Sequence, residues 1–237
     1  MNEITTITFL KFAGFKNKKW AFTMMNKAHK GLAQVPGQIF YKLMGSGRGH
    51  GFNPLPDWST YTLLQVWENE EQASQFLAQS NLMEQYKMHT LRHWSLFMKT
   101  VMAKGQWSGQ NPFRKSKSLS AEIPYIGVIT RATIKPRQLL NFWRYVPNSM
   151  KPLYQNPGLL FTKGIGEVPI LQMATFSLWQ NKEALMQFAY HSKAHRTAIE
   201  KTRTLNWYSE ELFARFQLYR YEGDWDGLSI NLAKNPG

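Results

Sequence analysis

An internal repeat is the feature that most constrains how this chain can fold. The pattern Trp-x-Asn-x-Glu occurs at residues 67–71 and again at residues 179–183, 112 residues later. Further blocks recur in the same order at similar offsets: Gln-Phe at 75–76 and 187–188, Gly-x-Gly at 45–47 and 164–166, and Gly-x-Trp-x-Gly at 105–109 and 223–227. Because separate blocks recur in one order, we expect two copies of a single structural unit.

The stretch 110–124 separates the two copies. It is bounded by Pro112 and Pro124 and is rich in serine and basic residues, a composition typical of a linker. We therefore predict a first half over residues 1–109, a linker over 110–124 and a second half over 125–237.

Each half carries the same order of predicted elements. Apolar and β-branched runs predict strands at 4–12, 38–44, 60–67 and 94–103, with helices at 20–35 and 69–92. The second half repeats this order with strands at 125–134, 159–165, 171–179 and 211–221, and helices at 137–145 and 182–203. The predicted fold class is α+β: two tandem ferredoxin-like βαββαβ units that form a pseudo-dimeric α+β barrel.

Composition excludes several kinds of protein. The chain has 43% hydrophobic residues and nine Trp, enough for a substantial core, and it has no Cys. Disulfides, Cys-ligated zinc, iron–sulfur clusters and thiolate-ligated haem are therefore excluded. Neither a secretory signal nor an apolar run of about 18 residues is visible, which favours a cytoplasmic protein. The formal net charge of +14 would attract nucleic acid, anionic lipid, an acidic protein or an anionic cofactor.

Most local motifs favour structural roles. The glycine-rich stretch 45–52 is followed by Pro54 and Pro56, which indicates a turn and not a phosphate-binding helix start. His89 and His93 lack the third ligand of a zinc-hydrolase signature, and no Gly-x-Ser-x-Gly elbow occurs. The aromatic residues lie mainly within predicted strands and helices, so core packing explains them better than nucleic-acid binding does.

Two histidines in the last predicted helix are candidate ligands. His191 and His195 lie in the second half, where a helix over the sheet could leave a slot for a flat apolar group. A neutral imidazole in such a slot can ligate iron. The repeat aligns His195 with Met83, so such a site would exist once per chain.

Four longer motifs carry a family resemblance: Trp-Ala-Phe at 20–22, the glycine-rich stretch 45–52, Gly-Ile-Gly-Glu-Val-Pro at 164–169, and the segment 207–216. With these motifs the chain resembles the spheroidene monooxygenases, carotenoid-oxidising enzymes of photosynthetic bacteria. The resemblance extends from about residue 9 to residue 227. Arg48 and His50 depart from the pattern expected in that loop, which leaves the identity of the substrate open.

The resemblance implies a haem-dependent monooxygenase that uses dioxygen and an external electron donor, such as a ferredoxin, to hydroxylate or ketolate an acyclic carotenoid. It implies haem b with His195 as the iron ligand. Candidate cations for the haem propionates are Arg131, Lys163, Arg196 and Arg215.

A carotenoid must be collected from a membrane or a carrier, so we expect peripheral contact with the inner face of the membrane. Trp20 and Phe22, among lysines in the first predicted helix, could make that contact. Two alternatives stay open: a haem-binding or haem-degrading protein without carotenoid oxygenase activity, and a cofactor-free barrel that binds hydrophobic ligands. The sequence predicts no nucleic-acid partner.

Overall fold

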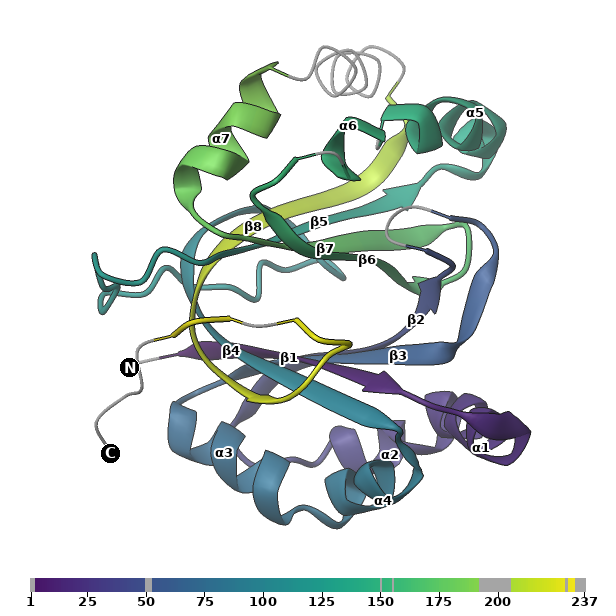
Figure 1. Ribbon diagram of the computed structural model, residues 1–237. Coiled ribbons are helices and arrows are strands. Elements are labelled where there is room, and N and C mark those ends of the chain that lie inside the picture. Colours follow the sequence, from purple (N-terminus) through teal and green to yellow (C-terminus); the bar gives the residue numbers. More distant parts are fainter. Residues whose placement is uncertain are drawn as a thin grey trace.

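Eight antiparallel strands in the described residues close into one barrel, with helices on its outside (Figure 1). The computed structural model describes residues 3–49, 53–149, 151–154, 156–191, 206–228 and 230–232. The strand order around the barrel is β1-β3-β2-β6-β7-β5-β8-β4. Helices of the first half cover one side of the barrel and helices of the second half cover the opposite side. The predicted fold class is therefore confirmed.

The elements follow the predicted order in both halves. The first half contains β1 (Ile4–Lys11), α1 (Gly14–Lys27), α2 (His29–Leu32), β2 (Gln38–Gly47), β3 (Pro56–Trp67), α3 (Glu70–Gln79), α4 (Asn81–His89) and β4 (Arg92–Gly105). The second half contains β5 (Ile126–Ile134), η1 (Pro136–Gln138), α5 (Leu139–Ser149), α6 (Lys151–Tyr154), β6 (Leu159–Val168), β7 (Gln172–Trp179), α7 (Lys182–His191) and β8 (Tyr208–Gly223). Within the described part of the chain, no helix is both long and apolar enough to cross a membrane.

The long helix predicted at 69–92 is two helices, because Ser80 begins a new one. The hydroxyl of Ser80 accepts a hydrogen bond from the backbone amide of Met83, at 3.2 Å, and its backbone is extended. Asn69 caps α3 in the same way by accepting from the amide of Gln72 at 3.0 Å. Two side-chain caps within this stretch define two helix starts.

Two seams join the halves into a single sheet. At one seam β4 pairs with β8 along residues 94–105. At the other, β2 pairs with β6 only through Gly45 with Gly166 and Ser46 with Ile165. Both halves therefore share one core, and the backbone pairing between them is much shorter at the β2–β6 seam.

Apolar side chains fill the interior of the barrel. Alternate residues of the strands point inward, as period-two geometry requires. The buried interior cluster contains, among others, Ile7, Phe9, Leu64, Leu96, Ile129, Phe176 and Leu218. Because buried side chains fill the described interior, we expect binding sites at the ends of the barrel or on its outer faces.

A tryptophan from each copy of the Gly-x-Trp-x-Gly motif closes one end of the barrel. Trp107 is fully buried against Phe40, and Trp225 is 8% exposed and packs against Phe9 and Trp94. Both copies of the motif use positive φ at the same places, including 57° at Ser108 in the first copy. The repeat found in the sequence is therefore a pair of end plugs.

The first glycine of each plug tolerates no side chain. A Cβ on Gly105 would lie 2.1 Å from the carbonyl oxygen of Glu211, and a Cβ on Gly223 would lie 2.1 Å from that of His93. Both glycines also have positive φ, at 99° and 78°. Close approach of β4 and β8 therefore requires glycine at both positions.

The segment 110–124 packs on the barrel over much of its length. Phe113 is 4% exposed and meets Phe216 edge-to-face with ring centroids 5.0 Å apart. The side-chain amide of Gln217 donates hydrogen bonds to the carbonyl oxygens of Ser120 and Ile123, at 2.6 and 3.0 Å. The segment is thus attached to the core, and the division of the chain at 110–124 stays a prediction.

Replacing Trp107 with alanine tests the role of the plug. Because the indole is completely buried, we expect Trp107→Ala to lower the free energy of unfolding by about 3–5 kcal/mol, measured by urea denaturation. Trp58, which is 50% exposed, is the matched control, and Trp58→Ala should change stability by less than about 1 kcal/mol. Equal stability losses in the two variants would contradict the plug.

Candidate functional site

The two halves differ in the outer faces of their sheets. In the first half, Leu43, Leu63, Thr8 and Ser95 form one row of register partners on the side facing the helices. Leu63 and Thr8 are fully buried and Leu43 is 4% exposed. The leucines of this row and the helices above them thus close this face.

The equivalent row in the second half has smaller residues on two of its strands. Gly164, Thr175, Thr130 and Phe213 are its register partners across β6, β7, β5 and β8. Gly164 and Thr175 occur where the first half has Leu43 and Leu63, and Thr130 occupies the position of Thr8. Thr130 is exposed to solvent although β5 lies between two other strands, whereas Thr8 is fully buried. We call this row the small-residue row.

Apolar clusters border the small-residue row on two sides. On the α7 side, Trp179 and Phe188 lie with ring centroids 5.4 Å apart. On the α5 side, Phe142 meets Trp207 edge-to-face at 6.2 Å. Figure 1 shows α5, α6 and α7 on this side of the barrel. A small floor between aromatic walls has a shape that suits a flat apolar group.

Arg215 adds positive charge to this face. It lies on β8 opposite Val128, one row from Thr130, and its guanidinium carbon is 5.9 Å from the ring centroid of Phe213. Its Nε is buried and has no hydrogen-bond partner among the described residues. A buried guanidinium nitrogen without a partner is suited to receive an anionic oxygen.

The predicted iron ligand lies beyond the part of the chain that the structure describes. His195 and Arg196 fall in the segment 192–205, outside the described residues. His191 is the last residue of α7, and its side chain is also outside them. Within the described residues, no group of three or more His, Asp and Glu side chains could hold a metal ion. His89, the histidine of the 89/93 pair that lacks a third ligand in the sequence, stacks on Trp20 with ring centroids 4.1 Å apart.

Two other predicted cofactor cations face the barrel interior. Arg131 follows the inward-facing Ile129 by two residues and lies over the ring of Trp107, at 5.6 Å. Lys163 precedes the inward-facing Ile165 by two residues and lines the same hollow as Trp225. Arg131 and Lys163 are therefore near opposite plugs, and neither shares the outer face with Arg215.

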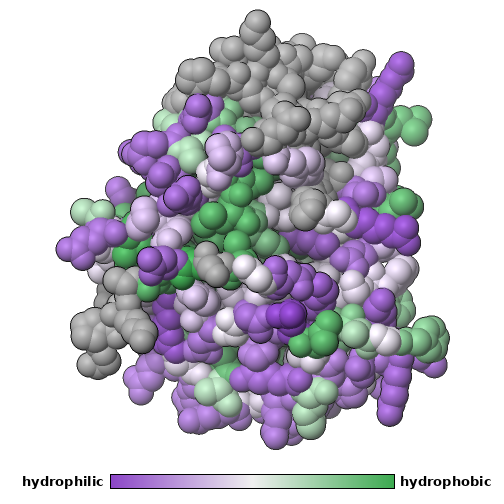
Figure 2. Space-filling view, in the orientation of Figure 1, coloured by the Kyte–Doolittle hydropathy of each residue, from purple (hydrophilic) through white to green (hydrophobic). Residues whose placement is uncertain are grey.

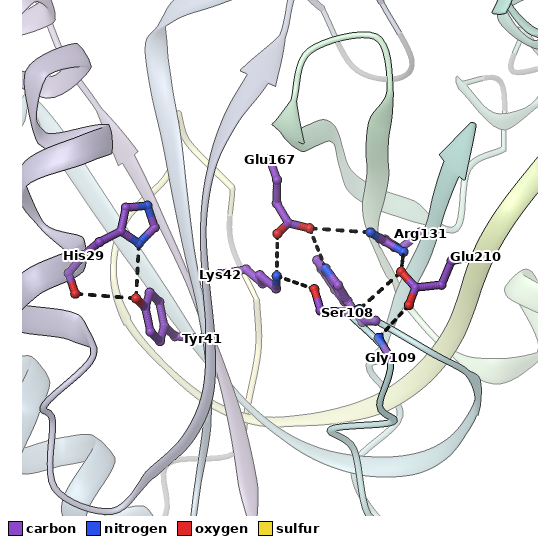
Figure 3. A network of polar contacts seen from close by, with 9 residues as sticks. His29, Tyr41, Lys42, Ser108, Gly109, Arg131, Glu167 and Glu210 are labelled. Carbon is purple, nitrogen blue, oxygen red and sulfur yellow. Dashed lines mark hydrogen bonds and ion pairs between the residues drawn. The ribbon is translucent and has the colours of Figure 1, made fainter. Parts of the chain in front are cut away.

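Arg131 belongs to a buried ionic network around the Trp107 plug (Figure 3). Glu167 is at its centre, where it accepts hydrogen bonds from Lys42 at 2.5 Å and from the indole nitrogen of Trp107 at 2.6 Å. Arg131 approaches Glu167 at 3.8 Å and forms an ion pair with Glu210. The network fixes the plug against both halves of the chain.

Glu210 also binds two backbone amides of the plug that contains Trp107. Its carboxylate accepts hydrogen bonds from the amides of Ser108, at 3.2 Å, and Gly109, at 2.7 Å. Burial raises the pKa of Glu210, but these two amides and Arg131 outweigh it and hold the pKa below its usual value. Glu210 therefore holds the backbone of the plug, a role that its local sequence does not indicate.

At the other end of the barrel, Lys163 pairs with Asp57. The two side chains are 2.8 Å apart, and Lys163 also donates to the carbonyl oxygen of Gly49 at 3.2 Å. Burial raises the pKa of Asp57, while hydrogen bonds from Lys163 and Ser59 outweigh it and lower the pKa to about 2. These partners are 106 residues apart in the sequence, so no local pattern indicates the pair.

A separate apolar pocket lies at the β2–β6 seam. Its volume is about 270 Å³, and it extends between α1, the start of β3 and the turn from β6 to β7. Phe22, Trp58, Tyr61, Ile170 and Met173 are among its lining residues. We call it the seam pocket. It touches the outer faces of both halves, where pairing between the strands is short.

The Asp57–Lys163 pair predicts a pH dependence of stability. The folded-state pKa of about 2 lies below the unfolded value near 3.8, so this contribution is present above pH 4 and is lost as the pH falls toward 2. Asp57→Asn should remove roughly 2 kcal/mol at pH 7 and flatten the fall in stability over that window. Chemical denaturation between pH 7 and pH 2 measures both effects.

The exposed Glu84 is the control, and Glu84→Gln should keep the wild-type pH profile of stability. If Asp57→Asn also kept that profile, the contribution of the Asp57–Lys163 pair would be refuted.

Comparisons with known proteins identify the family. No family model matches the chain. A spheroidene monooxygenase of Cereibacter sphaeroides is 33% identical over 226 residues, which cover 95% of this chain and 69% of that protein. One of Rhodobacter capsulatus is 32% identical over 94% of this chain and 93% of that protein.

Solved structures support the fold. A crystal structure of aldoxime dehydratase in complex with butyraldoxime superposes with a TM-score of 0.63 over 93% of this chain and 82% of that chain, at 9% sequence identity. At such low identity the likeness concerns the fold alone. The sequence relatives, in contrast, match nearly the whole chain, and they show that it belongs to the spheroidene monooxygenase family and is an oxygenase.

Proposed function

We propose that this chain is a haem-dependent monooxygenase that uses dioxygen and an external electron donor, such as a ferredoxin, to hydroxylate or ketolate an acyclic carotenoid. The observation that carries the proposal is the small-residue row. It leaves Thr130 exposed on one outer face of the barrel, while the matching row of the first half is closed by Leu43 and Leu63. We take the surface at Thr130 as the hollow that receives the cofactor. The names of the sequence relatives support the substrate class.

The chemistry of the surrounding residues fits haem b. Thr130 and Thr175 provide a floor without bulk, and the Trp179–Phe188 and Phe142–Trp207 contacts provide apolar walls. Arg215 offers a buried guanidinium nitrogen for a propionate. Arg131 and Lys163 already pair with carboxylates in the barrel interior, so we assign the propionate role to Arg215 and Arg196.

His195 is the residue that we assign as iron ligand, because it follows α7 closely in the sequence and α7 borders the small-residue row. Bound haem would supply the binding and reductive activation of dioxygen. The protein's own contribution is to orient the substrate and exclude water, which the aromatic walls favour. The chain has no Cys, so ligation by a thiolate is excluded.

Absorption spectroscopy tests the ligand. After expression with adequate haem, we expect the wild type to show a Soret band with about one haem per chain, and His195→Ala to lose or shift that band. His29→Ala, at an exposed position of the first half, should keep the wild-type spectrum. Haem-free wild type after reconstitution would overturn the proposal in favour of a cofactor-free barrel. An unchanged band in His195→Ala would move the ligand to another histidine, with His191 next.

Filling the small-residue row tests the location. Thr130→Trp places an indole on the proposed floor and should abolish haem binding while the circular dichroism spectrum stays native. Thr23→Trp, at an exposed threonine of α1, should bind haem normally. Full haem occupancy in Thr130→Trp would exclude this face as the haem site.

Turnover separates an oxygenase from a protein that only binds haem. With a reduced ferredoxin and dioxygen, the wild type should convert an acyclic carotenoid to hydroxylated or keto products, and ¹⁸O₂ should label them. Loss of the Soret band with release of iron, without carotenoid oxidation, would identify haem degradation instead.

A further inference from the structure

We infer that the seam pocket is the port through which the hydrophobic substrate leaves an anionic bilayer, and that the exposed side of α1 with the adjoining start of β3 is the surface that contacts the lipid. This inference rests on the proposed function for the nature of the substrate. Contact with the bilayer can be tested without it.

Large apolar side chains surround the mouth of the seam pocket and are open to solvent. Phe22 and Trp58 are 57% and 50% exposed, and their rings meet edge-to-face at 5.4 Å. Both also line the pocket. Phe15, 83% exposed, lies two helical turns before Phe22, and Leu55, 55% exposed, lies between two prolines that line the pocket. We call these four residues the apolar rim.

Positive charge accompanies the apolar rim. Helices α1 and α2 contain five lysines, at positions 16, 18, 19, 27 and 30, and no acidic residue. Lys18 and Lys19 lie between Phe15 and Phe22 on the same side of α1, as helical spacing requires. Arg48 donates to the carbonyl oxygen of Pro56, at 3.3 Å, beside the rim. Figure 2 shows hydrophobic and strongly hydrophilic side chains interleaved toward the lower right, where α1 lies in Figure 1.

The acidic residues at the pocket are already paired. Asp57 pairs with Lys163, and Glu167 pairs with Lys42. The rim therefore presents exposed aromatic groups beside lysines of α1 and α2 that form no ion pair with another described residue. This combination binds the headgroup region of an anionic bilayer. Charge complementarity thus favours a lipid surface as the occupant.

The pocket leads from the rim toward the proposed haem face. Met173 lines the pocket, and it pairs with Ala132 in the row next to the small-residue row. It also packs with Phe142 and Trp207, the aromatic wall on that side. The flexible thioether side chain of Met173 therefore connects the lining of the pocket with the aromatic wall beside the small-residue row. The distance along the strand from Met173 to Thr175 is about 7 Å, two strand residues.

Tyr61 adds a polar group without a described partner to a mainly apolar lining. The hydroxyl of Tyr61 is buried and has no hydrogen-bond partner among the described residues. Burial raises the pKa of Tyr61 to about 12, so the phenol is neutral and can donate a hydrogen bond. The pocket thus fits a long apolar chain that carries an oxygen, and its volume of about 270 Å³ holds a segment of such a chain.

Vesicle sedimentation tests the docking surface. We expect the wild type to bind vesicles of phosphatidylcholine with 30% phosphatidylglycerol, and the double variant Phe15→Ser/Trp58→Ser to bind roughly tenfold more weakly. Leu140→Ser, at an 87% exposed position of α5, is the matched control and should bind like the wild type. Equal binding by the double variant and the control, or no binding by the wild type, would overturn the docking surface.

A glycine at the wall of the pocket allows it to be filled without a clash. Gly45 lines the pocket, and a Cβ built on it meets no atom within 4 Å. Gly45→Leu should weaken binding of parinaric acid, a fluorescent conjugated polyene fatty acid, by roughly tenfold. Gly31→Leu is the control, because Gly31 on α2 has the same free space and lies outside the pocket. Unchanged parinaric acid affinity in Gly45→Leu would overturn the port.

The two proposals can fail separately. If the wild type binds vesicles and parinaric acid but never binds haem, the proposed function fails and the port stands as a lipid-binding site. If haem-loaded protein oxidises a detergent-solubilised carotenoid but does not bind anionic vesicles, the function stands and the inference fails.

Discussion

Closure of the sheet is the constraint on which the rest of this structure depends. A four-stranded ferredoxin-like half has two edges with unpaired backbone groups, and an edge of that kind needs a partner. Here β4 pairs with β8 along a long seam, and β2 pairs with β6 along a short one. Once both seams are formed, the inward side chains make a single core and the helices are confined to the outside. Any ligand must then bind at the plugged ends, at the short seam or on an outer face.

Ion pairs across the halves determine how they fit together. Buried ion pairs add little net stability, but a misplaced half would leave a buried charge without a partner, which is strongly unfavourable. The plug of the first half is bound by Glu167 and Glu210 of the second. Further ion pairs join one half to the other: Lys11 with Asp226, Lys42 with Glu167, Asp57 with Lys163, Arg92 with Asp224, and Arg220 with Glu70. Such pairing favours one register of the two units over slipped alternatives.

The fold could be predicted well from the sequence, because the repeat and the alternation of apolar residues in the strands can be recognised without knowing any contact. The order of elements, the barrel and the two Gly-x-Trp-x-Gly motifs were visible in this way. The partners of the charged residues were not, since Asp57 and Lys163 meet only after the seams close. The sequence does indicate that the side chains of Arg131 and Ile129 point to the same face of the strand, because alternate strand residues share a face. A shift of one residue would have placed Arg131 on the outer face. Sequence alone does not tell which of two alternating faces is the interior. The hollow at Thr130 likewise depends on comparing the same row in both halves.

Fusion of the two units in one chain has a consequence for how a site can evolve. In a symmetric homodimer every substitution appears twice, so smaller residues at the positions of Leu43 and Leu63 would open both faces and weaken both packing layers. In the single chain, the second copy carries Gly164 and Thr175 while the first keeps its two leucines. One copy can thus act as a stable scaffold while the other loses packing in favour of a cavity. Because the two halves are joined in one chain, a substitution in one half leaves the other half unchanged.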